Sequence, residues 1–129
     1  MKKLLLFAML FITIAASGQI RLGYTPSEIK YEFSKYTFEN DVADDGTPML
    51  LMKTNYAYIY YYFIDNKCVQ TVIFPKNDYV VQNFVQIFNE SYVIVDDTEW
   101  KYYSNGKIMS VTLKYFDKED QFAFVAYII

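Results

Sequence analysis

One aromatic hairpin most limits what this chain can fold into. Residues 56–64 are rich in tyrosine and apolar side chains, and residues 68–74 form a second run of β-favouring residues. Only Asp65, Asn66 and Lys67 separate the two runs. Such a short connection cannot make a parallel crossover, so the two runs are predicted to pair as antiparallel strands.

Further strand-like runs are joined by similarly short connections. They are residues 49–53, 92–95, 99–103, 107–116 and 121–128. Asn105 and Gly106, between two of these runs, are a strong hairpin signal because both residues tolerate positive φ. The pattern predicts one antiparallel sheet of about six to seven strands.

Two helices complete the predicted fold. Thr25, Pro26 and Glu28 combine a capping residue, a first-turn proline and a capping box, and the helix that they start should end near Thr37. Residues 39–48 are expected to form a polar loop.

The second helix is predicted to follow Pro75 and Asn77. Its apolar residues fall on one face: Val80, Val81, Phe84, Ile87 and Phe88. The predicted order is α-β-β-β-α-β-β-β-β, an α+β fold with two helices packed on one face of the sheet. Tyr62-Phe63 and Tyr115-Phe116, each followed closely by an aspartate, leave open a repeat of two α-βββ units.

The first 18 residues have the pattern of a secretory signal. Lys2 and Lys3 form a basic start, residues 4–16 are uncharged and largely apolar, and small residues precede an expected cut before Gln19. The apolar run is shorter than the roughly 20 residues that span a bilayer as a helix. We expect export to the bacterial periplasm, the cell surface or the exterior. Residues 19–129 should then form a single domain with no transmembrane segment.

Charge and composition argue against several classes of function. Two of the 12 basic residues lie in the signal, so the mature chain has five more acidic than basic side chains, and nucleic-acid binding is not expected. The chain has no histidine, which removes the usual catalytic triads and histidine-based zinc sites. The single cysteine, Cys68, lies in a strand-like run and is expected to be buried.

These observations predict no catalytic residues, no metal and no cofactor. A loose calcium contact by Asp41, Asp44 and Asp45 stays open beside the simpler interpretation, a solvated turn. An EF-hand that starts at Asp41 would need different residues at Ala43 and Met52.

Tyrosines in the first hairpin are the one candidate binding site. In a strand, Ala57, Ile59, Tyr61 and Phe63 share one face, which is the better core face. The other face carries Tyr56, Tyr58, Tyr60 and Tyr62. This row would offer rigid contact area and hydroxyl groups for recognition of a protein or a glycan. The alternative is that these tyrosines only stabilise an exposed sheet face. Trp100 and Tyr102 are expected in the core.

One short segment resembles a known kind of domain. Leu22-Gly23-Tyr24-Thr25-Pro26-Ser27-Glu28-Ile29 is similar to the helix start of small bacterial envelope domains of the SmpA/OmlA and β-lactamase-inhibitor-protein type. Those domains combine short helices with an antiparallel sheet. This chain differs by lacking the lipidated cysteine and by having strands between its helices. The resemblance implies an interaction domain of the cell envelope.

Together these features predict an exported, noncatalytic binding module. Its partner is expected to be another envelope protein or a glycan, and the module is expected to be a monomer or a weak homodimer. Two alternatives remain: a small envelope enzyme that uses carboxylate, tyrosine or lysine groups in a cleft, and a structural component that assembles through its tyrosine face.

Overall fold

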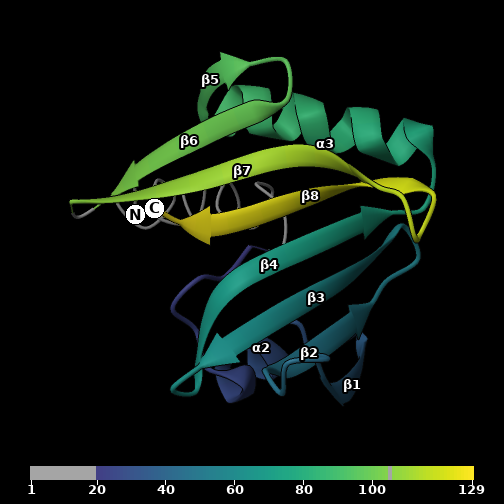
Figure 1. The fold of residues 1–129 in the computed structure, drawn as a ribbon, viewed down its shortest axis with the longest axis vertical. Coiled ribbons are helices and arrows are strands. Elements are labelled where there is room, and N and C mark those ends of the chain that lie inside the picture. Colours follow the sequence, from purple (N-terminus) through teal and green to yellow (C-terminus); the bar gives the residue numbers. More distant parts are fainter. Residues whose placement is uncertain (1–19, 105) are drawn as a thin grey trace, which may run out of the picture.

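A computed structural model describes residues 20–104 and 106–129, in which two helices pack on one antiparallel sheet (Figure 1). The helices are α2 (Pro26–Glu32) and α3 (Asp78–Ser91). The strands are β1 (Thr37–Val42), β2 (Pro48–Lys53), β3 (Ala57–Ile64), β4 (Lys67–Pro75), β5 (Val93–Asp96), β6 (Glu99–Ser104), β7 (Lys107–Phe116) and β8 (Gln121–Ile128). The predicted signal, residues 1–18, and Asn105 of the predicted hairpin lie outside the described residues.

The predicted strand number and order are wrong, because β1 is an eighth strand that the sequence pattern did not indicate. The observed order is α-β-β-β-β-α-β-β-β-β. β1 occupies residues for which the sequence pattern predicts the end of the first helix and a polar loop, and α2 ends earlier, at Glu32. Five of the six β1 residues are exposed, and only Phe38 packs against the core. An edge strand of this kind is held by backbone hydrogen bonds and shows no apolar alternation.

The two halves of the described chain have the same topology. The strand order across the sheet is β1-β2-β3-β4-β8-β7-β6-β5, so the halves meet where β4 pairs with β8. Each half is one helix followed by four consecutive antiparallel strands, an α-ββββ unit in place of the predicted α-βββ unit. The similar pairs Tyr62-Phe63 and Tyr115-Phe116 lie near the ends of the corresponding strands β3 and β7.

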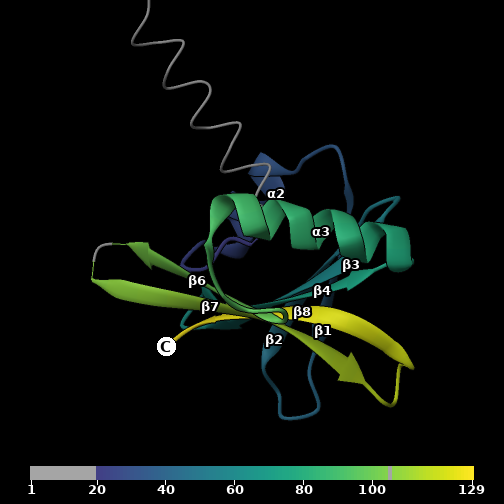
Figure 2. The ribbon, with the colours of Figure 1, turned by 90° about the horizontal axis from the view of Figure 1, so that it is seen from above.

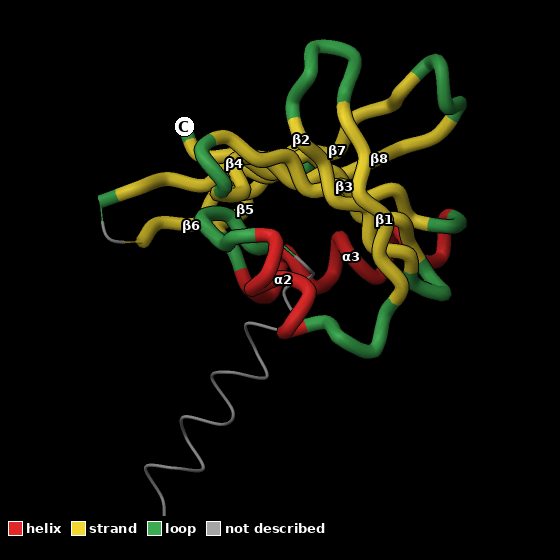
Figure 3. Tube along the Cα trace, turned by 90° about the horizontal axis from the view of Figure 1, so that it is seen from below, coloured by secondary structure: helices red, strands yellow, loops and turns green. Residues whose placement is uncertain are grey.

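Both helices cover the same face of the sheet (Figures 2 and 3). The predicted apolar face of α3 is confirmed, since Val81, Phe84 and Phe88 are buried. The rings of Phe84 and Phe88 pack against Phe124 of β8, and Phe88 also contacts Trp100 of β6. This aromatic cluster is the centre of the main core.

The predicted core positions in β6 are confirmed only in part. Trp100 is fully buried, and its indole Nε1 donates a hydrogen bond to Asn89 Oδ1 of α3 at 2.7 Å. Tyr102 lies on the same face but is 45% exposed, because its ring packs against Tyr92 beyond the end of α3.

The opposite face of the sheet, here called the open face, is not covered by α2 or α3. The connections β1–β2 and β7–β8 project on this side (Figure 2). Antiparallel sheets commonly leave one face to solvent, and such a face usually carries polar side chains. Here it carries aromatic ones.

Candidate functional site

Three of the four predicted tyrosines lie together on the open face. The alternation predicted for β3 is confirmed, because its four core-face residues are buried and Tyr58, Tyr60 and Tyr62 point away from the helices. Tyr56 does not join this row. It precedes β3 and packs on the helix side, with its ring 6.2 Å from that of Phe84. Thr54 Oγ1 accepts hydrogen bonds from the Tyr56 and Ala57 N–H groups, which turns the chain before the strand begins.

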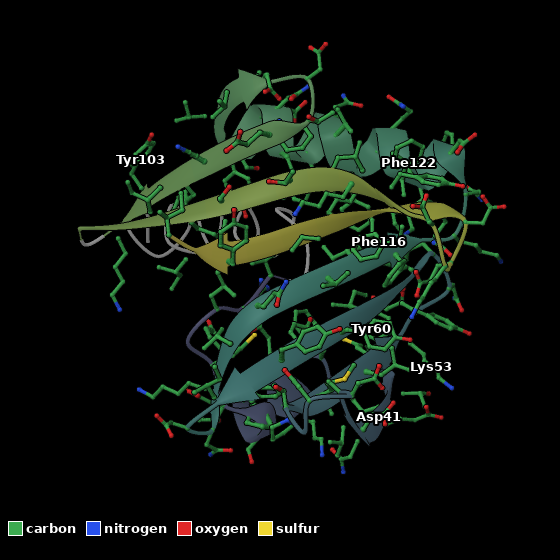
Figure 4. All side chains as sticks on the ribbon, viewed as in Figure 1. Asp41, Lys53, Tyr60, Tyr103, Phe116 and Phe122 are labelled. Atoms are coloured by element: carbon green, nitrogen blue, oxygen red, sulfur yellow. The ribbon has the colours of Figure 1, made fainter. Side chains whose placement is uncertain are left out.

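The three tyrosines form one wall of a shallow groove with a volume of about 370 Å³. Its lining consists of Tyr58, Tyr60, Tyr62, Val72, Phe74, Phe116, Glu119 and Gln121. Antiparallel register places Tyr58 opposite Phe74 and Tyr60 opposite Val72 of β4. Figure 4 shows Tyr60 and Phe116 on the viewer's side of the sheet.

Edge-to-face contacts connect the rings of the groove. The Tyr60 and Phe74 ring centroids are 5.7 Å apart at an interplanar angle of 86°, and those of Phe74 and Phe116 are 5.4 Å apart at 65°. These geometries are favourable for aromatic pairs and hold the rings in place. The groove therefore presents ring edges as well as ring faces.

A small second core lies beneath these rings. Val72, Ala123 and Val125 are buried on the open face, with Tyr60 and Tyr62 packed against them. Tyr58 is 49% exposed, while Tyr60 and Tyr62 are half-buried. The tyrosines thus shield apolar residues and leave part of their own surface to solvent.

Glu119 lines the groove, and the charges of Asp41 and Asp45 also act on its tyrosines. Burial raises the pKa of the Tyr60 hydroxyl, and the charges of Asp41 and Glu119 raise that pKa further. Burial also raises the pKa of Tyr62, with Glu119 and Asp45 adding to the effect. Among the described residues, none of these three carboxylates has a cation within ion-pair distance. The groove therefore combines neutral phenols with a negative rim.

Lys53 lies at the rim of the groove and already forms an ion pair. Lys53 Nζ is 2.8 Å from Glu39 Oε1 and 6.0 Å from the centroid of the Tyr58 ring. The hydrogen bond that Lys53 donates to Glu39 Oε1 is the main reason why the pKa of Lys53 is raised. Figure 4 shows Lys53 and Asp41 at the β1–β2 side of Tyr60.

Two further hollows adjoin the groove at the α3 end of the sheet. One, of about 510 Å³, shares Tyr58, Phe74 and Gln121 with the groove and continues to Asn55 and Lys76. The next, of about 440 Å³, runs past Lys76 and Gln121 to the first turn of α3. A ligand longer than one side chain can therefore extend from the groove along this path.

Other residues considered from the sequence have structural surroundings. Cys68 is buried as predicted, and burial raises the pKa of its thiol. Asp45 Oδ1 accepts a hydrogen bond from the Thr47 N–H in the β1–β2 turn, and the side chain and backbone of Thr47 lower the pKa of Asp45. In residues 20–104 and 106–129, His, Cys, Asp and Glu do not gather in any group of three or more that could hold a metal ion.

Sequence reasoning did not identify the half of the groove that lies outside β3. Phe116 could have been found by extending the alternation of Ser110, Thr112 and Lys114 by one step. Phe74 could have been found in the same way from its position opposite Tyr58 in the predicted hairpin. No local pattern indicates Glu119, which reaches the groove from the β7–β8 turn.

Comparison with protein-family models, curated proteins and solved structures found no match. No helix within the described part of the chain is both long and apolar enough to cross a membrane.

Proposed function

We propose that this chain is an exported, noncatalytic binding module that recognises another envelope protein through the groove on its open face. One observation carries the proposal: Tyr58, Tyr60 and Tyr62 lie beside Phe74 and Phe116 in a groove that neither helix covers. Tyrosine combines a rigid apolar ring with a hydroxyl, and aromatic residues are enriched at the centres of protein interfaces.

Electrostatics favour binding over acid–base catalysis at this site. A catalytic carboxylic acid usually has a raised pKa that suits proton transfer near neutral pH. The pKa of the Asp45 carboxyl is instead lowered, by hydrogen bonds with Thr47. The phenols of Tyr60 and Tyr62 are held in their protonated form at neutral pH, which suits hydrogen bonding to a partner.

The test is to compare two double variants of the purified protein. In Tyr58→Ala/Tyr60→Ala the groove loses two rings, whereas Tyr31→Ala/Tyr79→Ala removes two tyrosines that are 86% and 75% exposed elsewhere. Binding to immobilised envelope proteins and to a glycan array would be measured for both variants, with circular dichroism as the folding control. We expect only the groove variant to lose affinity, by about tenfold or more, since truncation of an interface aromatic commonly costs about 2 kcal/mol.

Three results would contradict the proposal. Equal binding by the two variants would exclude the groove as the binding surface. Binding to glycans alone would assign the groove to a different class of partner. A stable oligomer of the unmodified protein that the groove variant abolishes would instead show that the face assembles copies of this chain.

A further inference from the structure

We propose that the groove receives a lysine or arginine side chain carried by an extended segment of the partner protein. This inference rests on the proposed function and adds the chemical class of the ligand. Its basis is the combination of an aromatic groove with a rim of carboxylates that lack cationic partners among the described residues.

Three separate elements supply the negative charge. Glu119 lines the groove from the β7–β8 turn, and Asp41 of β1 lies across β2 in line with Met49 and Tyr62. Asp45 adds a third carboxylate from the β1–β2 turn, close enough to act on the Tyr62 phenol. Glu39 is a fourth carboxylate whose charge raises the pKa of the Tyr60 phenol.

The basic residues of this face do not cancel that charge. Lys53 is paired with Glu39 at 2.8 Å, so its charge is balanced locally. Lys101 and Lys114 are on the same face of the sheet, in register with Ser110 and Ala123, and neither of them lines the groove. A cation that enters the groove would therefore gain Coulomb attraction without displacing an existing ion pair.

The rings suit a cationic side chain better than a sugar. Stacking of a sugar favours a flat, accessible ring face, whereas the edge-to-face contacts of Tyr60, Phe74 and Phe116 tilt neighbouring rings steeply against each other. A cationic side chain can use both the edges and the faces of these rings. Its apolar stem packs on ring edges, and its charged end approaches a ring face or a carboxylate.

The shape of the surface favours a peptide over a free amine. The groove continues into the hollow of about 510 Å³ that leads past Asn55 and Lys76. Each residue of an extended peptide spans about 3.3 Å, so a segment of several residues can follow this path. We therefore assign the cation to a protein segment.

The test uses capped synthetic hexapeptides that differ at one central position. That position is lysine, arginine, norleucine or glutamate, and the probe without a peptide backbone is n-butylamine. Binding to the purified protein is followed by NMR titration at low salt and at 0.3 M salt, in the unmodified protein and in the variants Glu119→Gln, Glu90→Gln and Tyr60→Ala. Glu90→Gln is the matched control, because it removes an exposed carboxylate from α3, which lies on the face of the sheet opposite the groove.

We expect the lysine and arginine peptides to bind roughly tenfold more tightly than the norleucine peptide, as expected for a partly desolvated cation on aromatic rings. Added salt and Glu119→Gln should weaken this binding severalfold, and Glu90→Gln should leave it unchanged. Tyr60→Ala should reduce the affinity for every peptide that binds.

Each contrary result has a distinct meaning. Equal affinity for the norleucine and lysine peptides, with loss in Tyr60→Ala, would overturn the cationic ligand but leave the groove as the binding surface. Affinities that do not depend on Tyr60, or no binding by any peptide, would overturn the inference. Equal affinity for n-butylamine and the lysine peptide would overturn the assignment to a protein segment.

Discussion

Arg21 and Glu32 form an ion pair that ties the start of the described chain to the end of α2. Arg21 Nη2 is 2.7 Å from Glu32 Oε2, and Nε donates to the same carboxylate at 2.9 Å. Arg21 is 3% exposed, and its guanidinium lies 4.9 Å from the centroid of the Phe33 ring. A buried cation of this kind requires a partner, because desolvation of an unpaired charge is costly.

Glu32→Ala should therefore destabilise the protein by about 3 kcal/mol, since it leaves the Arg21 charge buried without its carboxylate. The free energy of unfolding would be measured by urea denaturation. Glu39→Ala, which removes the exposed partner of Lys53, is the control and should have little effect. If both variants lose the same free energy of unfolding, then burial does not make the Arg21–Glu32 pair more important for stability than the exposed Lys53–Glu39 pair.

The hydrogen bond between Trp100 and Asn89 joins β6 to α3. Asn89→Ala should cost about 1 kcal/mol, because the buried indole N–H loses its acceptor. Asn83→Ala is the matched control, since Asn83 is an exposed residue of the same helix and gains the same helix propensity. Urea denaturation of both variants checks the prediction, and it fails if Asn89→Ala is as stable as Asn83→Ala.

Tyr61 should make the protein less stable in alkali. Burial raises its pKa well above the ordinary value of 10.0. The folded state thus favours the neutral phenol. The stabilisation that the neutral Tyr61 phenol gives to the folded state is fully present below the pKa of tyrosine in the unfolded chain. It is lost as the pH rises from that value through the higher pKa of Tyr61 in the folded state. The free energy of unfolding should fall above about pH 10.

The measurement is a series of urea titrations between pH 8 and pH 11, expressed as the slope of stability against pH. The free energy of unfolding of Tyr61→Phe should fall less steeply with pH than that of the unmodified protein. Some slope will remain, because burial also raises the pKa values of Tyr60, Tyr62 and Cys68. Tyr31→Phe, at an exposed position, should keep the original slope. If the free energy of unfolding has the same dependence on pH in Tyr61→Phe and in the unmodified protein, then Tyr61 does not cause the loss of stability in alkali.

The β3–β4 turn offers a test of local backbone chemistry. Asp65 and Asn66 both have positive φ, 51° and 63°, as in the two-residue turns that suit antiparallel hairpins. Asn66→Gly should stabilise the protein by about 0.5 kcal/mol, whereas Asn66→Ala should cost about 1 kcal/mol because alanine resists the left-handed region. Thermal and urea denaturation would check the order Gly, Asn, Ala, and any other order would contradict this account.

Structural features that depend on residues close together in the sequence were predictable. The capping box of Thr25 and Glu28 is present, Asn77 caps α3, and β3 alternates between buried and open-face residues as expected. Each of these features repeats a local rule of backbone geometry or hydrophobic period, so a short window of sequence contains the information.

The candidate site was predictable only along one strand. Tyr58, Tyr60 and Tyr62 were identified because a strand places alternate residues on one face. Tyr56 was placed wrongly because the strand starts after it, where Thr54 turns the chain. A periodic pattern indicates a face, but it does not indicate where the pattern begins.

The sequence by itself determined the antiparallel α+β character, the helix starts, the hairpin turns and the core face of β3, because those depend on contacts between near neighbours. Only the tertiary structure decided that β1 joins the edge of the sheet, that Arg21 meets Glu32, and that Glu119 reaches the tyrosines of β3. These contacts join residues that are distant in the chain and carry no period, and their free energy arises only when the sheet brings them together.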